Sequence, residues 1–225
     1  MDFSSITNSL PFILSGAKYT VELTVTSAAG AIFLGTFLAL GKLSRNRLLS
    51  SVCSAYVTVV RTVPLVLFLF WFFFLVPLVL GWVSGRGTPV PIGPEMSALI
   101  TFVIFEAAYY AEIIRAGIQS ISRGQLAASY ALGLTFWQTM GNVILPQAFR
   151  NMGPVILTQT IVLFQDTSLV YVLSANDFMG AVSKIAQRDG ELTLMYCFAA
   201  VCYFIVSFTL SSGVKALQKK VAIVR

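Results

Sequence analysis

Ionisable and polar side chains stand within apolar stretches of this 225-residue chain, where burying them is costly. Arg61, Glu106 and the adjacent pair Gln165 and Asp166 each fall in a run apolar enough to cross a bilayer. At that depth a guanidinium and two carboxylates could contact a polar, charged solute, so these four residues form a hypothetical substrate pathway. Arg61, Glu106 and Asp166 could instead neutralise one another as structural pairs, because buried charges usually pair.

Enzymatic chemistry is disfavoured by what the chain lacks. Histidine is absent, which removes the commonest general base and metal ligand. The nearest approach to a phosphate-binding loop, GAIFLGT from Gly30 to Thr36, lacks the lysine that reaches the phosphates. We expect no catalytic residue, no metal site and no cofactor in this chain. An integral-membrane enzyme that uses the carboxylates as acid and base stays a minor alternative.

The elements that must position these groups are membrane-spanning helices. Apolar residues form 57% of the chain and charged residues 11%, a balance typical of membrane proteins. A spanning helix needs about 20 mostly apolar residues. Five spans are therefore predicted, at residues 19–40, 53–80, 96–118, 150–174 and 192–214. The fold class is all-α, a polytopic membrane helix bundle, and Glu112 and Arg115 are predicted to pair locally on the third helix.

The distribution of lysine and arginine orients this bundle, because basic residues accumulate on the cytoplasmic side. One side carries Lys42, Arg45, Arg47, Arg115, Arg123, Arg150, Lys215, Lys219, Lys220 and Arg225. The other carries Lys18, Arg86, Lys184 and Arg188. The N-terminus is therefore predicted outside the cell and the C-terminus inside. The net charge of +6 is interpreted as a topology signal, and no nucleic-acid partner is expected.

The same topology divides the chain into segments. Residues 1–18 form an extracytoplasmic N-terminal segment, residues 19–217 the transmembrane domain, and residues 218–225 a cytoplasmic tail. Residues 120–147 form a cytoplasmic connection within the transmembrane domain. The first ten residues have no basic region before an apolar core, so no cleavable signal peptide is expected.

The sequence of the cytoplasmic connection predicts helical structure rather than an irregular loop. Gln125 to Leu134 is predicted as a short helix, and Pro146 marks the start of the next span. The sequence from Ser122 to Phe149 resembles the coupling motif of ABC-importer permeases: EAA, three residues, Gly, nine residues, Ile, any residue, Leu, Pro. The positions concerned are Gln125, Ala127, Ala128, Ser129, Gly133, Val143, Leu145 and Pro146.

Two positions depart from this motif, since Ala127 replaces its glutamate and Ser129 its second alanine. The sequence Glu106-Ala107-Ala108 also reads EAA, but it is not the coupling motif, because it lies inside a span. The departure at Ala127 removes a charged contact at the surface that the motif serves.

Nearly the whole chain resembles the permease subunits of bacterial ABC importers for polar amino acids. The resemblance is carried by RTVPLVLFLFWFFFLVP from Arg61, FEAAYYAEIIRAGIQSISRGQ from Phe105, ILPQAFR from Ile144 and FQDTSLVYVLS from Phe164. The sequences of these stretches favour the glutamate/aspartate importer, with glutamine or histidine importers as the alternative. The resemblance implies a type I importer permease fold of five or six helices in the bacterial inner membrane.

The resemblance also implies partners: a second permease, two cytoplasmic ATPase subunits that bind ATP and Mg, and an extracytoplasmic substrate-binding protein. A second bundle is expected on physical grounds too, because five helices can hardly enclose a polar pathway within lipid. We expect the second permease to be a different chain with the complete motif. Gln125 to Pro146 would dock in an ATPase groove, with Gly133 permitting close approach, and would drive alternating access. A channel or anchor subunit is a less favoured alternative.

Overall fold

The computed structural model describes residues 4–221, and every regular element in that part of the chain is helical. The outer ends of the two predicted terminal segments, residues 1–3 and 222–225, lie outside the described residues. Five helical stretches are long and apolar enough to span a membrane: Leu10–Lys42, Leu65–Val83, Pro94–Gln119, Phe136–Leu173 and Leu192–Lys220. The prediction of an all-α polytopic bundle with five spans is confirmed.

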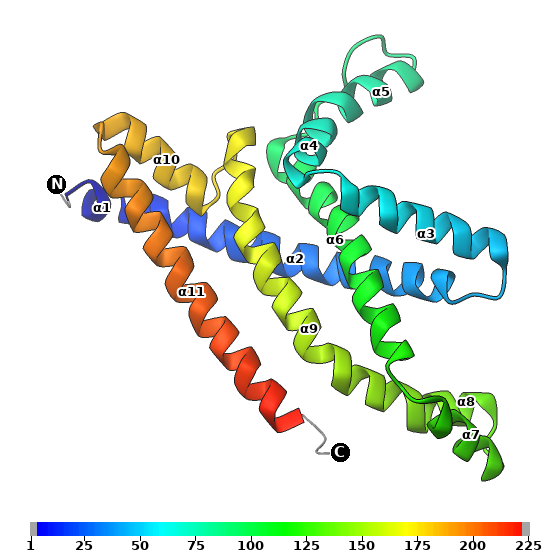
Figure 1. Ribbon diagram of the computed structural model, residues 1–225. Coiled ribbons are helices and arrows are strands. Elements are labelled where there is room, and N and C mark those ends of the chain that lie inside the picture. The colour runs from blue at the N-terminus through cyan, green and yellow to red at the C-terminus, as the bar shows by residue number, and fades with distance from the viewer. Residues whose placement is uncertain (1–3, 222–225) are drawn as a thin grey trace.

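The spans are assembled from shorter elements, some of which project from the bundle. Their order is α1 (Ser4–Asn8), α2 (Leu10–Lys42), α3 (Arg47–Thr62), α4 (Leu65–Phe70), the π-helix η1 (Trp71–Leu75), α5 (Val76–Val83), α6 (Pro94–Gln119), α7 (Arg123–Ala131), α8 (Phe136–Thr139), the π-helix η2 (Met140–Ile144), α9 (Leu145–Asp166), the 3-10 helix η3 (Thr167–Leu173), α10 (Phe178–Asp189) and α11 (Leu192–Val221). In Figure 1, α2 and α3 run beside each other, and α7 and α8 project at one end of the molecule.

Helices α2 and α6 share the most extensive packing interface of the bundle, and both present small residues there. Ala31 and Ala39 of α2 and Ala107 and Ala111 of α6 are fully buried. A Cβ atom on Gly35 would lie 2.9 Å from the carbonyl oxygen of Ala107 and 3.0 Å from the backbone nitrogen of Ala111. Small residues allow the backbones of membrane helices to approach closely. This contact positions α6, the helix that carries Glu106 and Glu112.

The predicted second span, residues 53–80, is wrong as a single helix. Helix α3 ends at Thr62, and α4 begins at Leu65. Val63 and Pro64 are extended, with φ/ψ of −98°/136° and −61°/135°. Proline has no N–H to donate and disfavours helical backbone in the residue before it. The second span, Leu65–Val83, therefore begins only after Pro64, and Arg61 lies in the last turn of the preceding helix α3 rather than within the span.

The ends of the first and fourth spans also differ from the sequence prediction. Helix α2 begins at Leu10 rather than at residue 19, with Pro11 in its first turn, a favourable place for proline. Pro146 lies in the first turn of α9 as predicted, but the helical stretch already begins at Phe136. That earlier start is set by a capping box between Thr135 and Gln138.

Helix α10 lies between the fourth and fifth spans and is attached to α2. The buried carboxylate of Asp177 caps it, accepting from the backbone N–H groups of Met179 (3.0 Å) and Gly180 (3.2 Å). The N–H of Phe178 donates to Oγ1 of Thr20 in α2 at 3.0 Å. Burial raises the pKa of Asp177 to about 6, although these backbone hydrogen bonds oppose the change.

Candidate functional site

The short helix predicted for Gln125 to Leu134 is observed as α7, Arg123–Ala131, so it begins two residues earlier and ends three residues earlier than predicted. Ala127 and Ala128 are exposed on it, whereas Ser129 is buried. The hydroxyl of Ser129 donates to the carbonyl oxygen of Gln125 at 2.8 Å, so a serine is satisfied where the motif has alanine. Because α7 projects from the bundle (Figure 1), its two exposed alanines are available to another protein.

Gly133 ends α7 in a left-handed conformation, with φ of +79°. Its N–H donates to the carbonyl of Tyr130 at 3.0 Å, and the N–H of Leu134 donates to the carbonyl of Ser129 at 3.1 Å. This pair of hydrogen bonds is a Schellman motif, which strongly favours glycine. Among the described residues no heavy atom lies within 4 Å of where its Cβ would be. Within the chain, backbone conformation explains this glycine, and close approach does not.

Large apolar side chains are exposed around this turn. Leu132 and Trp137 are each 81% exposed, and Tyr130 and Phe136 are also exposed. Such a cluster on a projecting segment marks an interaction surface. The predicted docking range, Gln125 to Pro146, includes these residues, but none of them was singled out as a contact. The available signal was the presence of apolar residues on both sides of a glycine turn within a basic connection.

The remaining motif residues lie outside α7. Val143 belongs to η2, and Leu145 and Pro146 begin α9. The side-chain amide of Gln147 donates to the carbonyl of Val143 at 2.8 Å, where the π-helix joins α9. The coupling motif therefore extends from the projecting helix α7 into the fourth span without leaving helical structure after Thr135.

Glu106 lies at the centre of the bundle and is only 1% exposed. Its Oε2 accepts a hydrogen bond from Nε2 of Gln159 in α9 at 2.9 Å. Its Oε1 has no hydrogen-bond partner within the part of the chain that the structure describes. One turn along α6, the hydroxyl of Tyr110 lies 2.9 Å from Oγ1 of Thr160. Gln159 was not predicted, and it makes Glu106 part of a polar contact between α6 and α9.

Arg61 is held by an aromatic ring. The central carbon of its guanidinium lies 5.1 Å from the ring centroid of Tyr109, a favourable cation–π distance. The ion pairs among residues 4–221 do not join Arg61 to Glu106 or Asp166. The alternative of direct mutual neutralisation is therefore wrong in this structure. Arg61 is exposed and its charge remains available.

Gln165 and Asp166 close helix α9 but face different surroundings. Asp166 is half-buried, whereas Gln165 is exposed and lines a cavity of about 510 Å³ with Ser168 and Ser207. That lining includes none of the three charged residues of the predicted pathway. The structure thus places Gln165 beside a separate polar cavity between the fourth and fifth spans.

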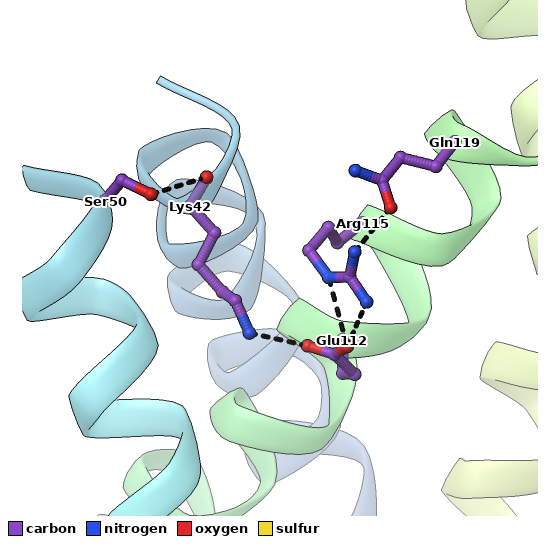
Figure 2. Close-up of polar contacts among 5 residues, drawn as sticks. All are labelled: Lys42, Ser50, Glu112, Arg115 and Gln119. Atoms are coloured by element: carbon purple, nitrogen blue, oxygen red, sulfur yellow. Dashed lines mark hydrogen bonds and ion pairs between the residues drawn. The ribbon is translucent and has the colours of Figure 1, made fainter. Parts of the chain in front are cut away.

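A polar network joins three helices at the end of the bundle nearest α7 (Figure 2). Nζ of Lys42 lies 2.7 Å from Oε2 of Glu112, and Nε of Arg115 donates to Oε1 of Glu112 at 3.0 Å. Arg115 also contacts Gln119, and Ser50 donates to the carbonyl of Lys42 at 2.9 Å. The predicted pair of Glu112 and Arg115 is confirmed, whereas Lys42 was not predicted. The network ties α2 and α3 to the last turns of α6.

Five apolar spans, polar groups buried between them and a projecting helical segment define a polytopic membrane helix bundle. The chain belongs to the family of binding-protein-dependent transport system inner membrane components, whose sequence model matches residues 31–223. The family inferred from the resemblance is thereby confirmed, as is a multi-pass protein of the inner membrane. The chain is a transporter subunit rather than an enzyme.

Individual relatives are similar over nearly their full length. The glutamate/aspartate import permease protein GltK of Escherichia coli O6:H1 is 50% identical over 221 residues, covering 98% of each chain. The arginine transport system permease protein ArtQ of Bacillus subtilis is 34% identical, covering 98% of this chain and 97% of its own. A crystal structure of an amino acid ABC transporter with histidines superimposes with a TM-score of 0.87 at 29% identity, covering 98% of this chain and 99% of that one. The predicted importer permease fold is confirmed.

Proposed function

We propose that this chain is the permease subunit of an ATP-driven importer for glutamate and aspartate. The observation that carries the proposal is its 50% identity over 221 residues to the glutamate/aspartate permease GltK. The glutamine transport system permease GlnP of Escherichia coli K12 is 29% identical over a similar length. The free guanidinium of Arg61 supports an anionic substrate, because it offers a cation for a carboxylate.

The substrate pathway in this proposal includes the buried groups of α6 and α9. Arg61 receives a substrate carboxylate, and the unpaired Oε1 of Glu106 receives the α-ammonium group. Gln165 and Asp166 contribute polar groups where α9 ends. Arg61 complements one carboxylate of a glutamate ion and Glu106 complements its ammonium group, whereas the second substrate carboxylate has no cationic partner among these four side chains.

The partners in this proposal follow from what the chain lacks. ATP and Mg bind to two separate ATPase subunits, a second and different permease completes the pathway, and an extracytoplasmic binding protein delivers the substrate. The N-terminus lies outside and the C-terminus in the cytoplasm, which places α7 and α8 against the ATPases. The exposed Leu132 and Trp137 then fill an apolar groove on an ATPase subunit.

The mechanism is rigid-body coupling between two states of the bundle. Closure of the ATPases moves α7, and α7 is joined directly to α6 and, through α8 and η2, to α9. Those two helices carry Glu106 and Gln159, so movement at the coupling segment changes the contact at the centre of the bundle. The site is thereby exposed alternately to each side of the membrane.

Uptake by the reconstituted four-subunit transporter with its binding protein tests the function. We expect ATP-driven accumulation of labelled glutamate and aspartate in preference to glutamine and histidine. Arg61→Ala should lower glutamate uptake by about tenfold, equivalent to about 1.4 kcal/mol of lost interaction, and Arg61→Lys should restore part of it. Preference for glutamine or histidine would overturn the substrate, and uptake without ATP would overturn the mechanism.

Replacing Gly133 tests the coupling segment. We expect Gly133→Val to disrupt the end of α7, because a β-branched residue at φ of +79° is strained by about 1–3 kcal/mol. Transport and substrate-stimulated ATP hydrolysis should both fall, while the bundle itself stays folded. Gly124→Ala is the matched control, since Gly124 lies within α7 and does not have a positive φ. Wild-type transport by Gly133→Val would remove the coupling assignment.

A further inference from the structure

A cavity of about 420 Å³ lies between α2, α9 and α11, and the transport mechanism does not use it. Its lining includes Val21 and Val25 of α2, Leu157 and Phe164 of α9, and Val206 and Leu217 of α11. A neighbouring cavity of about 260 Å³ shares the lining residues Val21, Phe164 and Val206 with it, so the two are adjacent. Together they form what we call the α9–α11 groove.

The larger cavity offers a ligand no free hydrogen-bond donor from the side chains that line it. Thr24 and Thr160 are the polar side chains in its lining, and both hydroxyls are already bonded. Thr24 donates to the carbonyl of Thr20 at 2.8 Å, and Thr160 donates to the carbonyl of Ile156 at 2.9 Å. An amino acid would lose its hydration there without compensation. The groove therefore suits a hydrocarbon chain.

The length of the groove matches one leaflet of a bilayer. Val206 and Leu217 are eleven residues apart on α11, a rise of about 16 Å at 1.5 Å per residue. Half of a hydrocarbon core of about 30 Å is about 15 Å. Val206 lies at the middle of the span Leu192–Lys220, so the cavity is long enough to reach from the middle of a bilayer to one surface.

Positive charge continues the groove at that surface. Lys220 lies three residues beyond Leu217 on the same face of α11, and Arg150 lies two turns before Leu157 on the same face of α9. Both side chains are exposed. Neither belongs to an ion pair within residues 4–221. Two uncompensated cations at the end of an apolar groove are complementary to a phosphate that carries an acyl chain.

We propose that the α9–α11 groove binds an anionic phospholipid of the leaflet on the basic side of the membrane. One acyl chain occupies the cavity, and Lys220 and Arg150 hold the phosphate. The lipid fills the space between α9 and α11, the helices on either side of the polar cavity that Gln165 lines. This site depends on the chain spanning a bilayer, but it does not depend on which amino acid is transported.

Gly213 allows the cavity to be filled without disturbing the protein. It lines the cavity, and no described heavy atom lies within 4 Å of the position of an added Cβ. Gly213→Leu therefore places a side chain in the path of the acyl chain. The matched control is Ser212→Leu, because Ser212 is exposed on the same helix and lies outside the cavity lining.

The test measures phospholipid retained by the purified transporter complex, using native mass spectrometry after incubation with phosphatidylglycerol or phosphatidylethanolamine. We expect wild type and Ser212→Leu to retain phosphatidylglycerol, and Gly213→Leu to lose it. The double variant Arg150→Gln, Lys220→Gln should retain phosphatidylglycerol only to the level of phosphatidylethanolamine. Glutamate uptake is measured in parallel, so a wrong substrate assignment and a wrong lipid site give separate results.

Two results would overturn the lipid site. One is that wild type retains phosphatidylglycerol and phosphatidylethanolamine in equal amounts and that Gly213→Leu does the same. The other is efficient cross-linking of Leu210→Cys, which lines the cavity, to a cysteine scanned through the second permease. That cross-link would show a protein helix in the groove in place of the acyl chain.

Discussion

Gly35→Val is expected to lower the unfolding temperature of the protein and its yield. The Cβ of the new residue would lie 2.9 Å from a backbone oxygen of α6 and 3.0 Å from a backbone nitrogen. Because these atoms belong to helical backbone, they can yield only if α2 and α6 move apart. Overpacking of a core typically costs about 1–3 kcal/mol, and rigid neighbours place this site at the upper end. Thermal unfolding and monodisperse yield in detergent measure the effect.

Gly213→Val is the matched control for this prediction. It makes the same change in a membrane helix, but at a position where no described heavy atom lies within 4 Å of the new Cβ. Its unfolding temperature should therefore stay close to that of wild type. If both variants unfold at the same temperature, α2 and α6 do not pack through Gly35 as described.

Glu112→Gln is expected to uncouple transport more than any other change in the polar network of Figure 2. The variant leaves Lys42 and Arg115, whose side chains are 14% and 28% exposed, without their counter-charge. Hydrogen bonds to charged groups contribute about 1.5–3 kcal/mol, and partial exposure places this network at the lower end of that range, about 1.5 kcal/mol. The last turns of α6 then loosen where they lead into α7. Substrate-stimulated ATP hydrolysis should continue while uptake per ATP falls.

A double-mutant cycle with Lys42→Gln separates this role from general destabilisation. The two residues are joined directly at 2.7 Å, so the double variant should lose less than the sum of the single losses. The measurement is uptake per ATP hydrolysed for wild type, both single variants and the double variant. Strictly additive losses would show that Lys42 and Glu112 act separately.

Hydropathy predicted the number of spans because a bilayer requires about 20 apolar residues in sequence. The same criterion hid the break at Pro64, since residues 53–80 are apolar on both sides of it. It also placed the start of α2 nine residues too late, because Leu10 and Pro11 lie within a short apolar stretch that is interrupted before residue 19 by Lys18. Local composition therefore predicted the fold class well and the helix ends poorly.

The site was predictable where its partners are neighbours in sequence. Glu112 and Arg115 are three residues apart, a spacing that places them on one helix face. Lys42 and Glu112 are 70 residues apart, and Gln159 and Glu106 are 53 apart, so these contacts depend on how the helices pack. Gly133 was predicted to permit close approach of a partner, whereas the feature that the structure shows, a positive φ, depends on the turn that follows α7.

The interruption at Val63 and Pro64 gives the junction between α3 and the second span a mechanical property that a continuous helix lacks. Pro64 has no N–H, so the carbonyl of Val60 has no helical donor to lose when the chain bends there. The span formed by α4, η1 and α5 can therefore pivot on α3 at low cost in backbone hydrogen bonds. Arg61 lies three residues from this pivot, so a change in the tilt of the span alters the position of the guanidinium relative to it.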